Sequence, residues 1–271
     1  MCEHCATQLH DDGHPILELG EWSPNKLFYL GQYSDIFTTG MSRRWPHRAY
    51  IDLFAGPGLN SVRGTGEIKD GSPLVALKQR TAFTHYVFVD SDAGHVSALE
   101  ARSRNLAPNS DKKVIYGDCN SPVVLSQIRT AVPDTALCLT FVDPFAFDIR
   151  FATLRALAEA LKTDLIVVVH IGNMKRALDY QPKSLDDFFG NGGEWYQTVQ
   201  KAGKRGATRA LLDYYKDRLA SLGYLRDKHQ SETLVKGVPR YYMMFATRHP
   251  RGLDFWRKAT RRTMGGQGRL L

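Results

Sequence analysis

The chain of 271 residues lacks several features that would place it in a membrane or outside the cell. It has no apolar run long enough to span a bilayer. Residues 1–5 begin no apolar segment of the kind that a secretory signal peptide contains. Cysteine is scarce, with four residues, and we interpret these as thiols or metal ligands rather than disulfides. These absences predict a cytoplasmic protein without a membrane anchor.

Internal repeats and low-complexity segments are also missing, which argues against a solenoid or a disordered chain. The hydrophobic fraction of 43% is sufficient for a substantial core. Lys and Arg number 36 against 28 acidic residues, which gives a net charge of +8. A basic excess of this size allows an anionic partner such as nucleic acid but does not require one.

Apolar segments alternate with helical patterns along the first two thirds of the chain, which predicts a parallel sheet with helices on both faces. Residues 1–20 are expected to form a polar, irregular segment, and residues 21–271 a single α/β domain. A helix is predicted from Ser23-Pro24, and residues 60–70 are expected to be a loop. An antiparallel hairpin is predicted near the carboxyl terminus. The expected strands are 49–54, 86–89, 113–116, 137–142 and 165–171, with 232–235 and 240–247 in the hairpin.

A glycine turn directly follows the first predicted strand, in Asp52-Leu53-Phe54-Ala55-Gly56-Pro57-Gly58. Gly56 and Gly58 allow a backbone to approach a ligand closely, and Asp52 could accept from an ammonium group, directly or through water. The dinucleotide fingerprint needs a third glycine where this chain has Ser61, so S-adenosylmethionine fits better than a nicotinamide. A tight turn without any ligand is the alternative.

Acidic residues also end the next two predicted strands. Asp90 is placed where a carboxylate can accept from both ribose hydroxyls, and Asp92 is its nearby rival or the N-cap of the next helix. Asp118 and Cys119 follow the third strand, and Asp118 could accept from an adenine amino group. A plain Asx turn at Asp118 is the alternative. We predict that Asp52, Gly56, Gly58, Asp90, Asp118 and Cys119 bind the cofactor.

The fourth strand ends in Asp143-Pro144-Phe145, which we predict to be the catalytic element. A carboxylate beside a proline carbonyl can present two acceptors to an exocyclic amine, and an aromatic ring can stack on a flipped base. This is similar to the motif of amino-directed nucleic-acid methyltransferases, except that one of its two prolines is absent. A strand end with a buried phenylalanine is the alternative. His170, at the end of the fifth strand, is either a pocket residue or a core histidine.

The amino terminus carries Cys2, Cys5, His10 and His14 in a spacing close to that of a zinc knuckle. Either these residues bind zinc or they belong to a fraying terminus. Basic residues recur in the last third of the chain, and those at 257, 258, 261 and 262 would form one charged face of a helix. This face is either solvated or tracks phosphates.

Four spaced segments make the chain resemble the three-Cys-motif partner family. These are Glu21-Trp22-Ser23 with Lys26-Leu27, the glycine turn with Asp70-Gly71-Ser72-Pro73-Leu74, Phe141-Val142-Asp143-Pro144-Phe145, and residues 241–247 with Phe255-Trp256. The resemblance implies a methyltransferase-like fold and a partner that is a three-Cys-motif protein of radical-SAM type. It does not imply a particular substrate.

Five parallel strands followed by an antiparallel pair are typical of class I methyltransferases. We therefore predict a Rossmann-like fold with a mostly parallel seven-stranded sheet, a carboxyl-terminal hairpin and an added amino-terminal helix. The predicted activity is methyl transfer from S-adenosylmethionine to nucleic acid, at a nitrogen. The alternatives are a non-catalytic partner module for the three-Cys-motif protein and a small-molecule methyltransferase.

Overall fold

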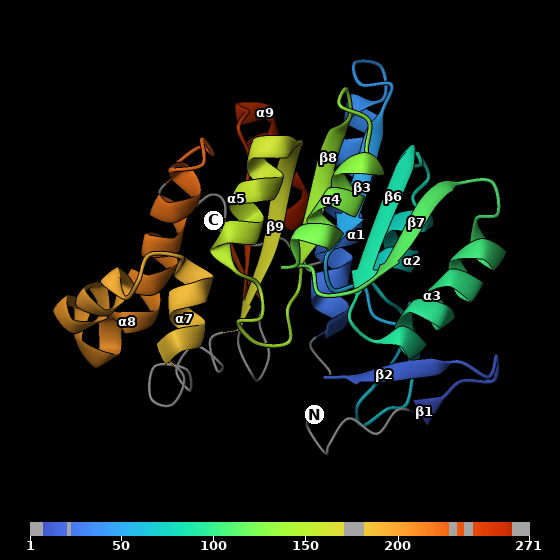
Figure 1. The fold of residues 1–271 in the computed structure, drawn as a ribbon, viewed down its shortest axis with the longest axis horizontal. Helices are drawn as coiled ribbons and strands as arrows, with labels where there is room; N and C mark the ends of the chain where they lie inside the picture. Colours follow the sequence, from blue (N-terminus) through green and yellow to red (C-terminus); the bar gives the residue numbers. More distant parts are fainter. Residues whose placement is uncertain (1–7, 21–22, 171–181, 228–231, 236–240, 262–271) are drawn as a thin grey trace.

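The computed structural model describes residues 8–20, 23–170, 182–227, 232–235 and 241–261 (Figure 1). Its centre is a seven-stranded sheet in the order β10-β11-β9-β8-β3-β6-β7. Five neighbouring strands are parallel, and β11 runs antiparallel between β9 and β10. The strands are β3 (Arg48–Asp52), β6 (His85–Asp90), β7 (Asp111–Tyr116), β8 (Leu137–Val142), β9 (Lys162–His170), β10 (Glu232–Val235) and β11 (Tyr241–Ala246).

This order confirms the predicted Rossmann-like class I methyltransferase fold. The chain runs from β3 to β6 and β7 on one side, then crosses back to β8, which pairs with the other side of β3. Every residue of β3 is buried, as are most residues of β8 and β9. Central strands of a parallel sheet are covered on both faces, so their sequences are nearly continuous apolar runs. That pattern is the reason the strand positions could be predicted closely.

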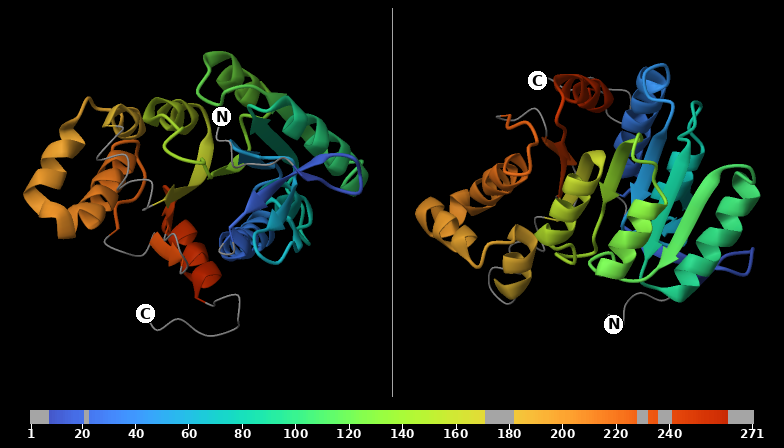
Figure 2. Two further views of the ribbon diagram at one scale, coloured as in Figure 1. Left: turned by 90° about the horizontal axis from the view of Figure 1, so that it is seen from below. Right: turned by 45° about the horizontal axis from the view of Figure 1, so that its top comes forward.

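Helices cover both faces of the sheet (Figures 1 and 2). One apolar cluster packs α4, α5, α7 and α8 on one face, and a second packs α1, α2 and α9 on the other. The N-cap alternative for Asp92 is confirmed, since its carboxylate accepts from His95 N at 2.9 Å. The helices are α1 (Ser23–Met41), α2 (Ser72–Leu77), α3 (Ala93–Leu106), α4 (Pro122–Thr130), α5 (Phe151–Ala160), α7 (Pro182–Phe189), α8 (Glu194–Ala220) and α9 (Pro250–Thr260).

Two segments expected to be irregular instead form a small second sheet, in the order β1-β2-β4-β5. The expectation of irregular structure is wrong for residues 8–19 and for residues 60–70, because each segment forms a hairpin and the two hairpins join through β2 and β4. Ile16 of β2 is buried, and Leu17 to Leu19 pair in parallel with Asn60 to Val62. The strands are β1 (Gln8–Leu9), β2 (Pro15–Leu19), β4 (Leu59–Val62) and β5 (Ile68–Asp70).

The small sheet lies below the main sheet in Figure 1, at the edge where the parallel strands end. It is built from β2, which enters from the amino terminus, and from β4 and β5, which follow the glycine turn after β3. Within the described parts of the chain, no helix is long and apolar enough to cross a membrane.

Candidate functional site at the carboxyl edge of the sheet

The fold brings four predicted acidic residues to one edge of the main sheet. Asp52 and Asp90 end β3 and β6, while Asp118 and Asp143 follow β7 and β8. Because these strands are parallel neighbours in the order β8-β3-β6-β7, their carboxyl ends lie side by side. Ligands of open α/β sheets bind at this edge, at the point where the strand order reverses. In this chain the reversal is at β3.

The glycine turn after β3 depends on backbone conformations that favour glycine. Gly56 has φ of +64° and Gly58 has φ of +89°. A Cβ on Gly58 would lie 3.1 Å from Leu99 Cδ1, and the Gly58 carbonyl accepts from Gly71 N at 2.7 Å. The turn is therefore packed tightly between α3 and the start of α2. Side chains at either glycine would strain the backbone and reduce the space beside it.

Asp90 is tied directly to this turn. Its Oδ2 accepts from Gly56 N at 2.7 Å, and its Oδ1 accepts from Asp92 N at 2.9 Å and lies 3.2 Å from His95 Nδ1. Burial raises the pKa of Asp90, but the bonds from His95 and the two backbone amides outweigh it, so the pKa is lowered. The same contact raises the pKa of His95, although burial opposes it. Asp90 is an ionised carboxylate with one acceptor position left on Oδ2.

Asp52 is placed differently from the prediction, because its side chain is fully buried. It accepts from the Tyr50 hydroxyl at 3.1 Å and from Phe54 N at 3.3 Å. Burial raises its pKa to about 7, although hydrogen bonds from Ser72, Phe54 and Tyr50 lower it. Asp52 holds the end of β3 in register with the turn, and its carboxylate does not face the surface.

Asp118 adopts the Asx turn that was its alternative. Its Oδ1 accepts from Asn120 N at 2.8 Å and from Asn120 Nδ2 at 3.0 Å. Asp118 is exposed, whereas the neighbouring Cys119 is buried in the core. Burial raises the pKa of the Cys119 thiol to about 12, so the thiol stays protonated and unreactive. Asp118 and Cys119 follow β7, whose carboxyl end lies beside that of β6, where Asp90 is.

Asp143 forms a buried ion pair that the sequence-based reasoning missed. Lys26 Nζ of α1 contacts Asp143 Oδ2, and His170 Nε2 lies 3.8 Å from Asp143 Oδ1, beyond hydrogen-bond distance. Burial raises the pKa of Asp143, but the charge of Lys26 and the nearby His170 lower it to about 2. The signal for Lys26 was available, because it lies on the apolar stripe of α1 together with Leu30 and Tyr33.

One oxygen of this carboxylate still has acceptor capacity. Asp143 Oδ1 is buried and has no hydrogen-bond partner among the described residues. Pro144 beside it is buried, while Phe145 is 75% exposed. The alternative of a buried phenylalanine is therefore wrong, since the ring lies on the surface, two residues after Asp143. A buried oxygen without a hydrogen bond lowers the stability of the folded protein, so a ligand that donates a hydrogen bond to it would bind favourably.

Arg102 of α3 is a second residue that the sequence did not reveal. It is buried, and its Nη1 donates to the carbonyls of Pro15 at 2.8 Å and of Pro57 at 2.7 Å. Its Nε and Nη2 bind both oxygens of Asp12 at 2.8 Å. One guanidinium therefore joins the β1–β2 hairpin to the glycine turn, and the Leu17 side chain lies against Gly56.

The predicted zinc ligands are divided between described and undescribed residues. His10 and His14 lie in the β1–β2 hairpin, whereas Cys2 and Cys5 fall outside the described residues. His10 Nδ1 is 3.6 Å from Asp12 Oδ1. The parts of the chain that the structure describes contain no cluster of three or more residues able to hold a metal ion.

Neither of two cavities is lined by Gly56, Asp90, Asp118 or Asp143. A polar hollow of about 580 Å³ lies between the β1–β2 hairpin and the turn that joins β4 to β5. A more enclosed and more apolar cavity of about 170 Å³ lies at the opposite end of the sheet. The features that identify the carboxyl edge as the candidate site are its carboxylates, its glycine turn and the Asp143 oxygen that lacks a hydrogen bond.

No protein-family model matches the sequence, and no curated protein matches it. Solved structures resemble the fold. Trm1 from Pyrococcus horikoshii, in complex with S-adenosyl-L-methionine, aligns over 84% of this chain with TM-score 0.47 and 11% identity. This chain spans 57% of the length of that protein.

Two further structures align over most of both chains. Protein LPL1258 from Legionella pneumophila covers 86% of this chain and 90% of its own, with TM-score 0.49 and 10% identity. An O-methyltransferase from Bacillus cereus in complex with SAH covers 83% and 82%, with TM-score 0.47 and 10% identity. All three scores lie below 0.5, so the fold assignment rests on the strand order and not on these alignments.

Proposed function

We propose that the protein is an S-adenosylmethionine-dependent methyltransferase that acts on a nitrogen of nucleic acid. One observation carries the proposal. The ionised Asp90, bound to the glycine turn, and the orphaned oxygen of Asp143 lie at the ends of the two strands that flank β3. A donor site and an acceptor for an amine are thus adjacent on one edge, in a class I methyltransferase fold.

The residues of the glycine turn fit the donor. Gly56 and Gly58 leave the backbone without side chains beside Asp90, whose remaining acceptor position on Oδ2 suits a ribose hydroxyl. Asp118 is exposed at the neighbouring strand end, where it would accept from the adenine amino group. Asp52 would act through the turn that it fixes, because its own carboxylate is buried. When bound, S-adenosylmethionine supplies the methyl group from its sulfonium sulfur.

Asp143, Pro144 and Phe145 would hold the acceptor. Oδ1 of Asp143 would accept one N–H of an exocyclic amine, and the Pro144 carbonyl would accept the other. Positive charge would develop on that nitrogen during methyl transfer, before its proton is lost to solvent. The Asp143 carboxylate, whose pKa is lowered to about 2, would stabilise that charge. The exposed Phe145 ring is placed to stack on the base. Lys26 positions Asp143 without occupying Oδ1.

Nucleic acid as the substrate class is supported by charge and by this aromatic residue. The chain carries a net charge of +8, and exposed Lys and Arg side chains are available for phosphate contacts. A base that is methylated at an exocyclic amine inside a duplex has to leave the stack, and a surface ring two residues after an acceptor carboxylate suits a flipped base.

The test is transfer of labelled methyl groups from S-adenosylmethionine to a cell extract, followed by separate nuclease and protease digestion. We expect label that nuclease releases and protease does not. Asp143→Asn should retain affinity for S-adenosylhomocysteine and lose transfer. Asp148→Asn is the matched control, because it changes an exposed carboxylate of the same loop and should transfer normally. Label that only protease releases would exclude nucleic acid as the substrate.

The second candidate is a non-catalytic partner module for a three-Cys-motif protein, as the sequence resemblance implies. One feature favours it: Lys26 already neutralises Asp143 in the folded protein. In that case the chain would co-purify with such a partner and would transfer no label to nucleic acid or protein. Label in nucleic acid, lost in Asp143→Asn, would exclude it.

A further inference from the structure

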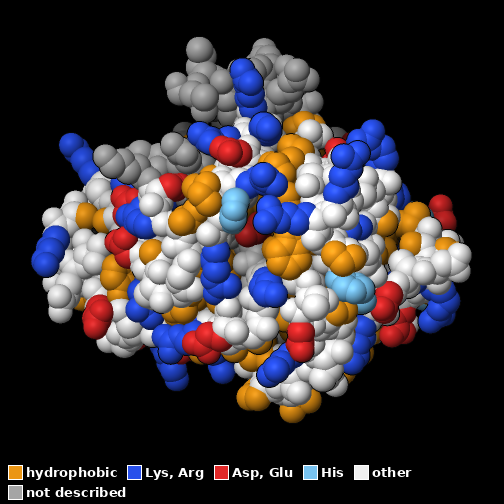
Figure 3. All heavy atoms as spheres, turned by 90° about the horizontal axis from the view of Figure 1, so that it is seen from above, with side chains coloured by type: hydrophobic (Ala, Val, Ile, Leu, Met, Phe, Trp, Pro, Cys, Tyr) orange, Lys and Arg blue, Asp and Glu red, His pale blue; other side chains and the backbone are white. Residues whose placement is uncertain are grey.

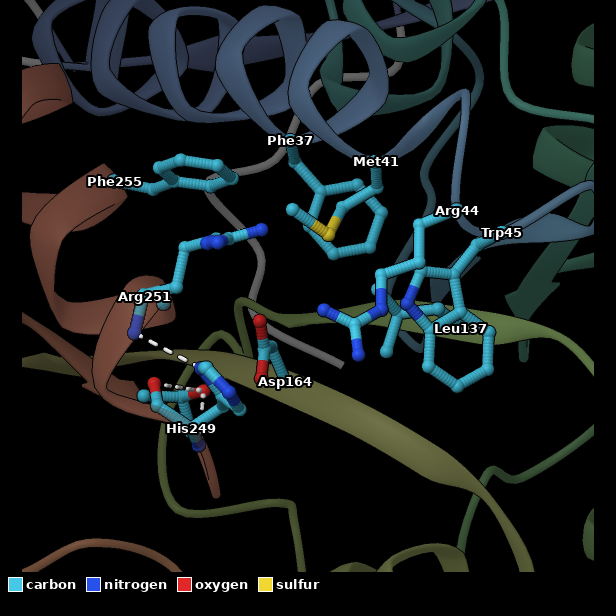
Figure 4. Close-up of a pocket in the computed structure, with 11 residues that line it drawn as sticks. Phe37, Met41, Arg44, Trp45, Leu137, Asp164, His249, Arg251 and Phe255 are labelled. Carbon is cyan, nitrogen blue, oxygen red and sulfur yellow. Dashed lines mark hydrogen bonds between the residues drawn. The ribbon is translucent and has the colours of Figure 1, made fainter.

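A cavity of about 170 Å³ lies at the amino ends of the parallel strands, on the side of the sheet opposite the candidate methyl-transfer site. It lies between the end of α1, the loop that follows it, β9 and the start of α9 (Figure 4). The proposed function makes no use of it. Its lining residues are Phe37, Met41, Arg44, Trp45, Leu137, Asp164, Thr247, His249, Arg251, Gly252 and Phe255.

The walls of this cavity are aromatic and aliphatic. Phe37 and Met41 are buried side chains of α1, and Trp45 and Phe255 face the same space from two other segments (Figure 4). A Cβ on Gly40 would lie 2.7 Å from Phe255 Cζ, so the glycine lets the ring lie close to α1. An apolar cavity of about 150 Å³ is large enough to bind benzene. The space here therefore suits one planar ring.

The floor carries a carboxylate that faces the space. Asp164, within β9, accepts from the Tyr33 hydroxyl at 2.9 Å and points between Arg44 and Arg251 in Figure 4. Burial raises the pKa of Asp164 to about 6, although bonds from Thr247 and Tyr33 lower it. This half-buried carboxylate has acceptor positions beyond these bonds, and an N–H group of a ligand could donate to one of them.

The rim carries two arginines with no acidic partner. Arg44 and Arg251 are exposed and form no ion pair with any described residue, yet both side chains reach over the cavity (Figure 4). Figure 3 looks onto this end of the molecule and shows Lys and Arg side chains gathered around its centre. A guanidinium fork is suited to bidentate contact with phosphate.

We propose that this cavity binds one cytidine phosphate unit, with the ring between the aromatic walls, its exocyclic amine on Asp164 and its phosphate on Arg44 and Arg251. Cytosine fits because it is a single ring and its N4 amine is the donor that carboxylates accept from. The unit is either a free mononucleotide or one residue of a single strand. The inference does not depend on methyl transfer, since it concerns the other end of the sheet.

The test is calorimetric titration of the full chain with CMP, together with fluorescence anisotropy of a labelled ten-residue oligo-dC. Arg44→Ala should weaken binding at least tenfold. Arg43→Ala is the matched control: Arg43 is an exposed neighbour of the same charge that does not line the cavity, and its loss should change affinity less than threefold. Because Arg44 is exposed, its replacement leaves the fold intact.

UMP should bind at least tenfold more weakly than CMP, since it lacks the amine that Asp164 accepts. Binding of CMP that depends on Arg44 assigns a mononucleotide site. Arg44-dependent binding of the oligonucleotide with none of CMP assigns a strand. The proposal is overturned if neither probe binds, if UMP matches CMP, or if Arg43→Ala weakens binding as much as Arg44→Ala. Methyl transfer measured in parallel on Arg44→Ala keeps this outcome separate from that of the proposed activity.

Discussion

Lys26 and Asp143 form a buried ion pair that joins the first turn of α1 to the carboxyl end of β8. The pair neutralises a carboxylate that burial would otherwise protonate, and it leaves one carboxylate oxygen available. A buried charge that loses its partner is strongly destabilising, whereas an exposed pair contributes little. The pair therefore stabilises the packing of α1 against the end of β8, and it keeps the proposed acceptor carboxylate ionised.

Lys26→Met should lower the free energy of unfolding at pH 7 by about 3–5 kcal/mol, because it leaves Asp143 buried and uncompensated. Lys69→Met is the matched control, since Lys69 pairs with Glu67 on the surface and its loss should cost less than about 1 kcal/mol. Urea unfolding followed by circular dichroism measures both. Equal effects of the two substitutions would show that the Lys26–Asp143 pair is not buried in the folded protein.

Asp52→Asn should make the protein relatively more stable as pH rises. The native state holds the Asp52 proton up to a pKa of about 7, whereas the unfolded chain releases it near the ordinary value of 3.8. Between these values the native state binds more protons, so wild-type stability falls with pH by at most about 1.4 kcal/mol per unit and is level above about 7. Asp52→Asn has no carboxyl group to titrate at this position, so its unfolding free energy does not fall with pH in this way.

Unfolding free energies of both proteins at pH 5 and pH 8 test this directly. We expect the difference, variant minus wild type, to be larger at pH 8 than at pH 5. A difference that stays constant, or shrinks toward pH 8, would show that Asp52 titrates at its ordinary value and is not held in a desolvated environment.

Gly58→Ala should lower both stability and affinity for S-adenosylhomocysteine. The backbone at φ of +89° strains any L side chain by about 1–2 kcal/mol, and the new Cβ would press on Leu99. Gly66→Ala separates the two effects, because Gly66 has φ of +67° with no atom near its Cβ position. Gly66→Ala should lower the stability by a comparable amount without weakening the binding of S-adenosylhomocysteine. Calorimetric titration and thermal unfolding of both variants are the measurements.

Arg102→Leu should release the β1–β2 hairpin from the glycine turn. The substitution removes the donors to Pro15 and Pro57 and the bidentate contact to Asp12. Hydrogen exchange in residues 8–19 should accelerate at least tenfold, and S-adenosylhomocysteine should bind more weakly. Arg104→Leu changes an exposed arginine of the same helix and should leave both unchanged. Unchanged exchange in Arg102→Leu would mean that strand pairing alone holds the hairpin.

The sequence predicted the main sheet well because its strands are buried runs with helical segments between them. It also predicted which carboxylates meet at one edge, since parallel strands place their carboxyl ends together. It missed β2, β4 and β5, because these strands are short with a weak apolar pattern, and because β2 and β4 pair across about 43 residues of sequence. Long-range pairing of this kind leaves little local signal.

The roles of individual carboxylates were predicted less well than their positions. Asp52 and Asp90 are both strand-end acids in the sequence, yet one is fully buried and the other is bound to the Gly56 amide. Their difference is set by Tyr50 and His95, which contact them only in the folded protein. A lysine on the apolar stripe of α1 was the one local sign of the buried pair with Asp143.

The most direct test of the methyl-donor site is calorimetric titration of the full chain with S-adenosylhomocysteine, for wild type, Asp90→Asn and Asp111→Asn. Asp111 is an exposed carboxylate at the other end of β7 and is the control. We expect one site per chain in wild type, affinity at least tenfold weaker in Asp90→Asn, and no change in Asp111→Asn. Absence of saturable binding in wild type, or equal affinity in all three proteins, would contradict a donor site at the carboxyl edge.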